Sequence, residues 1–222
     1  MKKGAVLSGT ALFRGIEETD LSGLLSCLEA TERHFSKGET VLRRGDRTDR
    51  MGLLLEGSVQ IVREDFWGNR SMVGLAGPGD IFAESYGLTG EPLEVSVLAA
   101  TDCEILFFSA AKAVSGCAQV CPFHELLSRN LLGMLARKNL LLTEKMRHMA
   151  RKTTREKLLS YLSAQALRAN GPEFDIPLDR QQLADFLGVE RSAMSAALGK
   201  LRDEGVLEVR KNHFRLLQSE ED

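Results

Sequence analysis

The sequence predicts an α+β protein with an N-terminal antiparallel β-roll, a long helix and a small C-terminal domain of helices and a β-hairpin. Three observations predict this fold. Short apolar runs alternate with turn residues up to about residue 108. A long helical pattern without Gly-Pro interruption follows at 123–150. Shorter helical patterns with capping signals then precede a pair of alternating strands.

Composition excludes several classes of protein. The chain has 222 residues, 43% of them hydrophobic, and a formal net charge of −2, which is an ordinary globular balance. No apolar run approaches the roughly 18 residues of a membrane helix, and the first residues lack a signal-peptide stretch. Four cysteines do not make a disulfide scaffold in a chain of this length. We therefore expect a cytoplasmic protein of one or two domains with no membrane contact.

The N-terminal part is expected to begin with a helix and to continue as short strands. Leucines recur at helical spacing within 12–28, and Thr19 or Asp20 can cap the start of this helix. The expected strands are 40–42, 53–55, 59–62, 72–75, 81–82, 95–99 and 105–108. Glycine-containing turns separate these strands, a pattern typical of a sandwich or roll.

The long helix predicts a homodimer. At about 1.5 Å per residue, a helix over 123–150 extends roughly 40 Å, which exceeds the width of one small domain. Its apolar stripe needs a partner, and a second copy of the chain is the simplest one. The alternative is that the stripe packs entirely on its own roll. The residues expected at the dimer interface are Leu127, Leu131, Met134, Leu135, Leu141 and Leu142.

A further helix is expected to begin at Thr153. Thr153 and Glu156 have the spacing of a capping box, and Asn170-Gly171 can end the helix. We therefore expect a hinge near 150–153, between the long helix and this one.

Residues 176–216 have the pattern of a winged helix-turn-helix. Asp179 can cap a first helix, Gly188 permits a tight turn, and the small Ala184 lets two helices cross closely. Alternating apolar residues on both sides of a turn at 211–213 predict a hairpin, the wing. This arrangement is typical of DNA-binding domains.

The second helix of this motif is expected to enter the major groove by its N-terminal end. Arginine can bond guanine through two donors, and serine can donate to or accept from several bases. The expected base contacts are Arg191, Ser192 and Ser195. The expected phosphate contacts, which position the protein without specifying sequence, are Gln181, Lys200, Arg202, Arg210 and Lys211.

The small net charge hides an uneven distribution. Residues 1–128 have 12 basic and 18 acidic residues, whereas residues 129–168 have 10 basic and 2 acidic residues. The acidic excess therefore belongs to the front of the chain and to its tail. We expect moderate DNA affinity with marked sensitivity to salt.

Three segments in order resemble the cyclic-AMP receptor protein/fumarate–nitrate regulator (CRP/FNR) superfamily. They are KGETVLRRGDRTDRMGLLLEGSVQIV (37–62), GPGDIFAE (77–84) and QQLADFLGVERSAMSAALGKLRDEGVLE (181–208). The resemblance implies a cyclic-nucleotide-binding-like jelly roll at 1–120 that senses an effector, a dimerisation helix at 121–150 and a winged helix-turn-helix at 151–222. It further implies a transcriptional regulator, not an enzyme, that binds palindromic operators as a homodimer and recruits RNA polymerase.

The resemblance places a small-molecule effector next to the second segment, but departures there argue against cyclic AMP. Glu84 matches the family's glutamate, whereas Ala83 replaces its glycine, and Leu93-Glu94 replace the Arg-Ser pair that holds the phosphate. A buried phosphate needs a cation or several donors. The expected pocket residues are Ile81, Phe82, Glu84, Tyr86, Leu93 and Val95.

The second helix of the DNA-binding motif also departs from the family pattern. Ala196 stands where members often have an arginine that contacts guanine. Arg191 and Ser195 are then expected to supply more of the base recognition. An alternative interpretation of Ala196 is an interaction module that has lost DNA binding.

Cysteine and histidine positions leave a cofactor open. No N-terminal cysteine cluster precedes Cys27, so an iron–sulphur cluster is not expected. Cys117, Cys121 and His124 are close enough in sequence for a metal or redox site. Residues 121–146 resemble a bacterial subgroup of the family with relatives that sense nitrosative stress through haem. The alternative is therefore a haem- or redox-sensing regulator of nitrosative or oxygen stress. Its candidate haem ligands are His34, His124, His148 and Met72.

Overall fold

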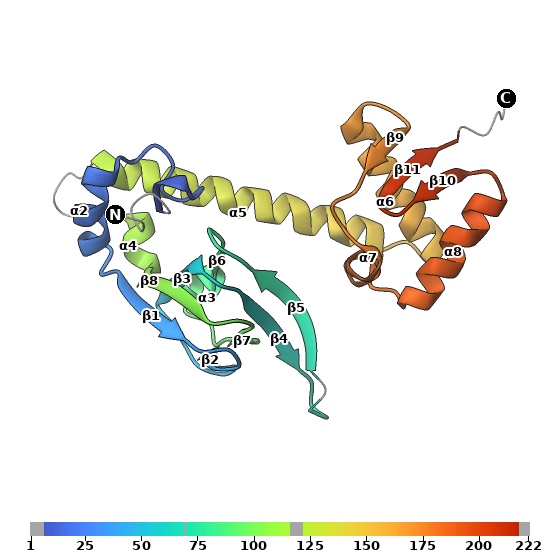
Figure 1. Cartoon of the computed structure of the whole chain (residues 1–222). Coiled ribbons are helices and arrows are strands. Elements are labelled where there is room, and N and C mark those ends of the chain that lie inside the picture. Colours follow the sequence, from blue (N-terminus) through green and yellow to red (C-terminus); the bar gives the residue numbers. More distant parts are fainter. Residues whose placement is uncertain (1–6, 69, 116–121, 218–222) are drawn as a thin grey trace. The chain divides into compact units, whose positions relative to one another are not determined.

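The computed structural model describes residues 7–68, 70–115 and 122–217. The chain forms two compact units, an N-terminal unit (Met1–Ala136) and a C-terminal unit (Arg137–Asp222). The division falls inside helix α5 (Pro122–Met149), shown in yellow in Figure 1. The first part of α5 thus belongs to the N-terminal unit and the rest to the C-terminal unit.

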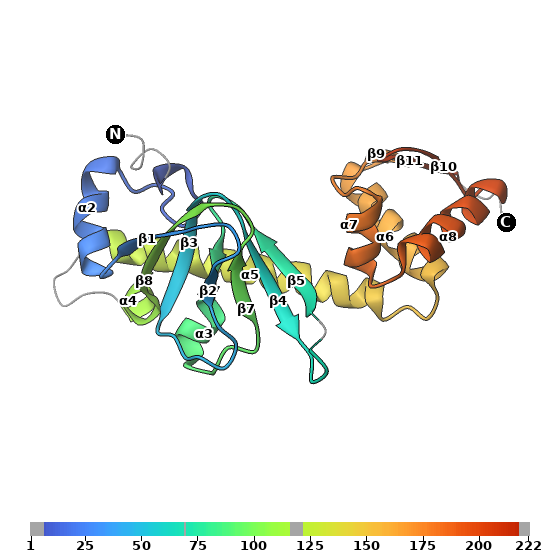
Figure 2. The same cartoon turned by 60° about the horizontal axis from the view of Figure 1, so that its bottom comes forward.

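The N-terminal unit is an antiparallel sandwich of two sheets (Figure 2). One sheet has the order β1-β8-β3-β6 and the other β2-β7-β4-β5. The strands are β1 (Thr31–Phe35), β2 (Thr40–Leu42), β3 (Arg50–Glu56), β4 (Val59–Glu64), β5 (Arg70–Ala76), β6 (Ile81–Phe82), β7 (Ser96–Ala99) and β8 (Cys103–Ser109). Leu54 and Ile105 from the first sheet pack with Val59 and Val97 from the second, so a core lies between the sheets.

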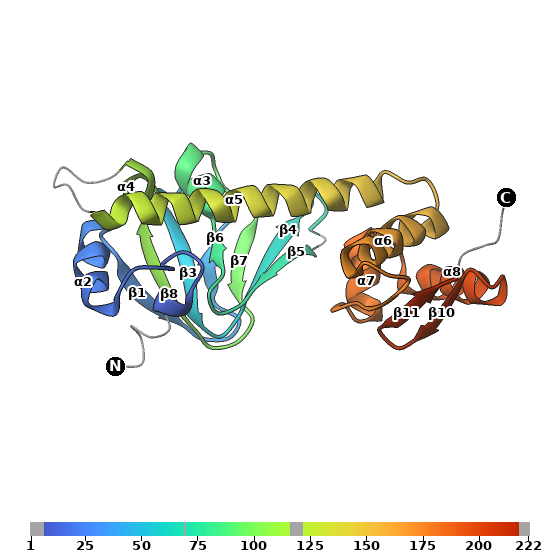
Figure 3. The same ribbon diagram turned by 90° about the horizontal axis from the view of Figure 1, so that it is seen from above.

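A second core covers the outer face of the first sheet. Helices α2 (Glu18–Cys27) and α4 (Ala110–Ser115) and the start of α5 pack there (Figures 1 and 3). Leu127 and Leu131 of α5 are both 0% exposed within this core, and Met134 and Leu135 pack partly against it. Leu127 and Leu131, which the sequence placed at the dimer interface, therefore pack on their own roll, although the alternative that the entire stripe does so is not met, because Leu142 is 61% exposed.

The C-terminal unit surrounds one separate core. Its elements are α6 (Thr154–Ala169), β9 (Glu173–Asp175), α7 (Arg180–Leu187), α8 (Arg191–Asp203), β10 (Leu207–Arg210) and β11 (His213–Leu216). Strand β11 lies between β10 and β9 (Figure 2). The side chains of Thr153 and Asp179 each accept the predicted capping-box bond, from the N–H groups of Glu156 and Gln182. The predicted α+β fold is confirmed.

The main departure from expectation is the first helix. Gly15 has a φ of +80°, a conformation that interrupts a helix, so α2 begins at Glu18 instead of at residue 12. Its N-cap is Glu17, and no side chain caps it, so the expectation of a Thr19 or Asp20 cap was wrong. Strands β1 and β9 and helices α3 (Glu84–Thr89) and α4 were not predicted. Within the described ranges, no helix is both long and apolar enough to cross a membrane.

Candidate nucleic-acid interface and effector cassette

The turn between α7 and α8 has the geometry that the sequence predicted. Gly188 ends α7 with a φ of +61°, where a side chain would be strained. The N–H of Val189 donates to the carbonyl of Ala184 at 3.0 Å, which closes the turn. Ala184 is 0% exposed, so its small side chain lies where the helices meet. The two helices therefore cross closely, as a helix-turn-helix requires.

Helix α8 separates an apolar face from a polar one. Met194, Leu198 and Leu201 are buried in the core of the C-terminal unit. The three predicted base contacts, Arg191, Ser192 and Ser195, are all exposed in the first two turns of α8. Arg191 is the first residue of the helix, where unpaired N–H groups and the helix dipole favour an anion.

The five predicted phosphate contacts fall into two groups. Gln181 donates to Asp185 at 2.9 Å, and Arg202 forms an ion pair with Asp203 at 3.0 Å. Lys200, Arg210 and Lys211 are exposed on α8 and on the wing. The carboxylates weaken the attraction of Gln181 and Arg202 for phosphate, so the three exposed cations are the stronger candidates.

A groove beside α8 contains residues that sequence reasoning missed. It has a volume of about 470 Å³, and Thr153, Thr154 and Arg155 at the start of α6 form one side of it. Ala193, Ala196 and Lys200 of α8 line the other side. Glu204 also lines the groove and pairs with Arg155 of the first turn of α6, while the start of a helix favours phosphate. The capping box at Thr153 was the sequence signal for this feature.

Besides the pairing of β11 with β9, side chains attach the wing to the rest of the C-terminal unit. Arg180 donates to the carbonyl of Lys211 at 3.0 Å, and its guanidinium lies 5.2 Å from the ring centre of Phe214. The ring nitrogens of His213 lie 3.0 Å from Glu173 and 3.1 Å from Asp175. These hydrogen bonds, Glu173 first, raise the pKa of His213 because both favour the doubly protonated ring.

His148, in the last turn of α5, is a second unusual histidine. It is 0% exposed, and its Nδ1 lies 2.8 Å from the hydroxyl oxygen of Ser160. Its ring packs against Tyr161 of α6 and Phe186 of α7, with centroids 5.8 Å and 6.4 Å away. Burial lowers the pKa of His148, although Glu144 at 3.5 Å opposes the effect.

Residues 83–95, which follow β6 and contain α3, are called the effector cassette. Ala83 precedes α3 with a φ of 59°, and Gly90 ends the helix with a φ of +71°. The left-handed conformation at Ala83 is one that glycine adopts without strain. The backbone therefore has a glycine-type conformation although the residue is alanine. Glu84, the matched glutamate, is buried.

The six predicted pocket residues lie in different surroundings. Ile81 belongs to the core under α2, α4 and α5, whereas Phe82 belongs to the core between the sheets. Leu93 is buried, and Tyr86 and Val95 are half-buried. The pocket at these six residues remains a prediction.

A cyclic phosphate does not fit this cassette in the family's usual mode. Leu93 is 2% exposed and apolar, and its neighbour Glu94 would repel the phosphate. No arginine or lysine occurs between Arg70 and Lys112, a stretch that the structure describes completely. The cassette thus lacks the cation that a buried phosphate requires.

The candidate metal and haem ligands are scattered. His124 is 3% exposed, and neither ring nitrogen has a hydrogen-bond partner among the described residues. Cys117 and Cys121 lie outside the described residues. His34 on β1 and Met72 on β5 are exposed on different sheets, and His148 lies in the C-terminal unit. In the described ranges, no three His, Cys, Asp or Glu side chains form a group suited to a metal ion.

Helix α5 exposes apolar side chains after Leu131. Leu132 is 63% exposed, Leu142 61% and Met146 70%, and Leu135 is half-buried. The positions 132, 135, 139, 142, 146 and 149 alternate steps of three and four residues, which is the spacing of a heptad seam. Asn139 is the polar member of this series. Sequence reasoning missed Leu132 and Asn139 because it followed the broader helical period.

Family models match both units. A model described as the cyclic nucleotide-binding domain matches residues 32–119, and one described as the Crp-like helix-turn-helix domain matches residues 156–221. The first match includes the cassette, and the second includes α6, α7, α8 and the wing. Each unit therefore corresponds to a separate module.

Individual relatives match most of the chain. The transcriptional activator protein FnrL of Cereibacter sphaeroides is 30% identical over 190 residues, which is 79% of this chain and 71% of the relative. The cyclic AMP receptor protein of Thermus thermophilus is 26% identical over 203 residues, covering 90% and 89%.

A solved structure supports the fold. The c-di-GMP-responsive global regulator CLP of Xanthomonas campestris has a TM-score of 0.56 and 19% identity, with 91% of this chain and 100% of that chain covered. This match supports the fold alone, and the family follows from the sequence relatives and the two family models. The chain belongs to the CRP/FNR family of effector-binding, DNA-binding transcriptional regulators, which are not enzymes.

Proposed function

We propose that the chain regulates transcription as a homodimer that binds a palindromic operator through α8, in response to an effector other than cyclic AMP. The observation that carries this proposal is the exposed polar start of α8, where Arg191, Ser192 and Ser195 lie together after the Gly188 turn. RNA polymerase is the further partner that the family implies. We propose a cytoplasmic location, because DNA and RNA polymerase are both found there.

In this proposal, different residues bind the bases and the phosphates of the DNA. Arg191 bonds a base through two donors, and Ser192 and Ser195 contact neighbouring bases. Lys200, Arg210 and the start of α6 bind phosphates on either side. Because Ala196 offers no base contact, specificity depends on few side chains. We therefore expect Arg191 to be the largest single contributor.

A mobility-shift titration on the DNA upstream of the gene tests the DNA-binding proposal. Arg191→Ala should weaken specific binding by about 1–3 kcal/mol, roughly 5- to 150-fold. The control variant Arg14→Ala removes an exposed arginine from the N-terminal unit and should bind as the wild type does. Absence of salt-dependent binding by the wild type, or equal binding by Arg191→Ala, contradicts the proposal and favours the interaction-module alternative.

The heptad seam of α5 supports the dimer. Leu132, Leu142 and Met146 are exposed in the single chain, and apolar residues at this spacing bury one another in a two-stranded coiled coil. A polar asparagine at one core position fixes register and the two-stranded state. Asn139 occupies such a position, so we expect it to pair with its counterpart in a parallel dimer.

Two adjacent leucines provide a matched test of the dimer. Leu142 lies on the heptad seam, whereas Leu141, which the sequence also placed at the interface, lies off it, and their exposed fractions are 61% and 60%. Leu142→Asp should shift the protein to monomer in analytical ultracentrifugation, and Leu141→Asp should leave the dimer intact. Equal effects of both variants would contradict the seam. Asn139→Leu should yield higher oligomers or mixed registers.

An absorbance spectrum of protein purified without oxygen separates the two effector classes. The scattered positions of His34, His124 and Met72 support an organic effector over haem. We therefore expect no Soret band. A Soret band with stoichiometric iron would replace this proposal with the haem-sensing alternative.

A further inference from the structure

The outer face of the sheet β2-β7-β4-β5 bears a groove that no part of the proposed function uses. It has a volume of about 400 Å³ and lies entirely within the N-terminal unit. The opposite face of the same sheet contributes Val59, Val97 and Ala99 to the core between the sheets. The groove is therefore separate from the interior and from the cassette at Glu84.

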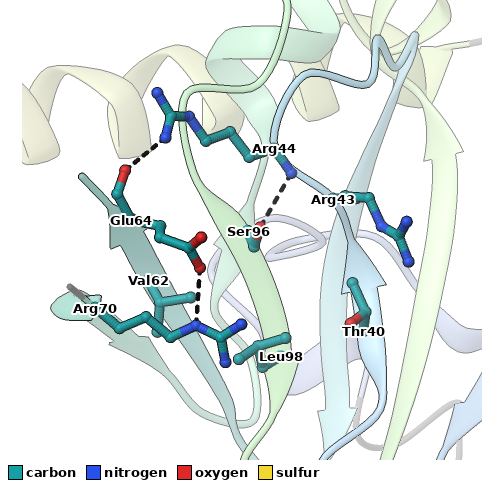
Figure 4. A pocket seen from close by; sticks show the side chains of 8 residues that line it. All are labelled: Thr40, Arg43, Arg44, Val62, Glu64, Arg70, Ser96 and Leu98. Carbon is teal, nitrogen blue, oxygen red and sulfur yellow. Dashed lines mark hydrogen bonds and ion pairs between the residues drawn. The ribbon is translucent and has the colours of Figure 1, made fainter. Parts of the chain in front are cut away.

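Strand register brings the lining side chains together (Figure 4). Val62 of β4 lies opposite Ser96 of β7, and Leu98 of β7 lies opposite Thr40 of β2. Alternation along each strand places these four side chains on one face. Val62 and Leu98 supply an apolar floor, and the hydroxyls of Thr40 and Ser96 lie beside it.

Three arginines surround this floor, with one carboxylate. Arg43 and Arg44 follow β2, and Arg70 begins β5 across the groove (Figure 4). Glu64 accepts a bond from Arg70 at 2.9 Å, and Arg44 donates to the backbone carbonyl of Glu64. The lining thus has a formal charge of +2.

The arginines retain free donors. The side chain of Arg43 has no hydrogen-bond or ion-pair partner among the described residues. Arg70 uses only its Nε on Glu64, and this pair is 68% and 46% exposed, so it contributes little stability. Clustered like charges repel each other unless an anion joins them. Guanidinium groups bind phosphate through paired donors.

We propose that this groove binds a small organic phosphate, whose dianionic group contacts the free donors of Arg70 and is attracted by the charge of Arg43, and whose apolar part lies on Val62 and Leu98. The charge of +2 matches a phosphate monoester, and the two apolar side chains add affinity for a flat or apolar substituent. The volume limits the ligand to about the size of a mononucleotide. The inference does not depend on DNA binding by α8.

Isothermal titration of the full chain at low ionic strength tests this site with three probes. Phenyl phosphate should bind at one site per chain, more tightly than inorganic phosphate, and phenol should not bind. Added salt should weaken the binding of phenyl phosphate. No saturable binding of phenyl phosphate by the wild type overturns the proposal.

Variants of opposite sign assign the binding to the groove. The double variant Arg43→Ala with Arg70→Ala should weaken phenyl phosphate binding at least about tenfold, because it removes a charge-assisted contact and two of the three cations of the lining. Glu64→Gln removes the only carboxylate and should strengthen binding several-fold. Leu98→Glu, half-buried on the outer face, should abolish binding. The control Arg14→Ala should match the wild type.

DNA affinity separates this inference from the proposed function. The double variant should bind operator DNA as the wild type does, since the groove lies outside the helix-turn-helix. If the double variant instead loses DNA affinity and keeps phenyl phosphate affinity, the arginines contact nucleic acid and the inference is wrong. If Arg191→Ala has no effect on DNA while phenyl phosphate binds as expected, only the proposed function fails.

Discussion

The candidate functional surfaces of the two units are built from different kinds of elements. In the C-terminal unit, most residues expected to contact DNA lie on α8 and on the wing, with Gln181 on α7, and each follows from a local pattern. In the N-terminal unit, the cassette has a family-like backbone but lacks the phosphate-binding side chains, and three arginines instead lie on the outer face of the second sheet. The comparison teaches that a DNA-binding module can be recognised locally, whereas a ligand site must be assembled from several strands.

The largest expected effect tests whether the two units are separate in stability. Leu183 of α7 is 0% exposed in the C-terminal core, so Leu183→Ala should destabilise that unit by about 2–5 kcal/mol. Hydrogen exchange measured by mass spectrometry should accelerate in peptides from 137–217. Peptides from β3, β4 and β8 should be unchanged. Uniform acceleration in both units would show that they unfold together.

A smaller effect separates capping from DNA contact at the start of α6. Thr153 accepts the capping bond from the N–H of Glu156 at 3.1 Å, and Thr153→Ala should cost about 0.5–2 kcal/mol of stability. Thr154→Ala keeps the cap but removes a hydroxyl from the groove beside α8. It should leave urea-induced unfolding unchanged and weaken DNA binding slightly. If Thr154→Ala unfolds more readily than Thr153→Ala, the cap is assigned to the wrong residue.

The cassette allows a test of its glycine-type backbone. An L-residue in the left-handed region is strained by roughly 1–2 kcal/mol. Glycine removes this strain, but it also makes the unfolded chain more flexible, which offsets part of the gain in stability. Ala83→Gly should therefore stabilise the N-terminal unit by about 0.5–1 kcal/mol in denaturant titrations. Ala99→Gly, at a buried strand position, is the comparison and should destabilise. Destabilisation by Ala83→Gly would mean that the backbone does not adopt the left-handed conformation in solution.

His213 predicts stability that is lost toward alkaline pH. Its pKa is raised by Glu173 and Asp175, so the folded state keeps the proton to a higher pH than the unfolded chain, whose value is about 6.5. The contribution is complete below about pH 6.5 and disappears as the pH rises through the raised folded value. His213→Gln should therefore lose more stability at pH 6 than at pH 9. A pH-independent difference would contradict the ionic arrangement.

The lowered pKa of His148 predicts that stability depends on pH in the direction opposite to that predicted for His213. Burial lowers its pKa, so the unfolded chain takes up the proton first on acidification. Stability should fall as the pH decreases from about 6.5 toward the lowered folded value. His148→Asn keeps a polar group beside Ser160 and should flatten this acid-side slope in thermal unfolding followed between pH 5 and 7. An unchanged slope would assign the acid sensitivity to another group.

How much the sequence predicted follows from the range of the interactions involved. The seven expected strands, the capping boxes at Thr153 and Asp179 and the turn at Gly188 all depend on neighbouring residues, and the structure contains them. Strand β1 was missed because four of its five residues are exposed, so it lacks the alternation of a half-buried strand.

The outer groove and the helix seam were not predictable in the same way. Val62 and Ser96 face the same groove only because β4 pairs with β7 in one particular register, and no local pattern specifies that register. On α5, Leu127 and Leu142 belong to the same apolar pattern, but one is buried in the roll and the other is 61% exposed. Burial, which depends on the fold, separates core residues from candidate interface residues.

The aromatic contacts of His148 determine where α5 can bend. The imidazole joins the final turn of α5 to Tyr161 of α6 and Phe186 of α7, so the two helices that flank residues 150–153 are clamped to each other. Because these helices contact each other, the loop at 150–153 can adopt few conformations. The hinge predicted near 150–153 is therefore bridged by one buried side chain that contacts both α6 and α7.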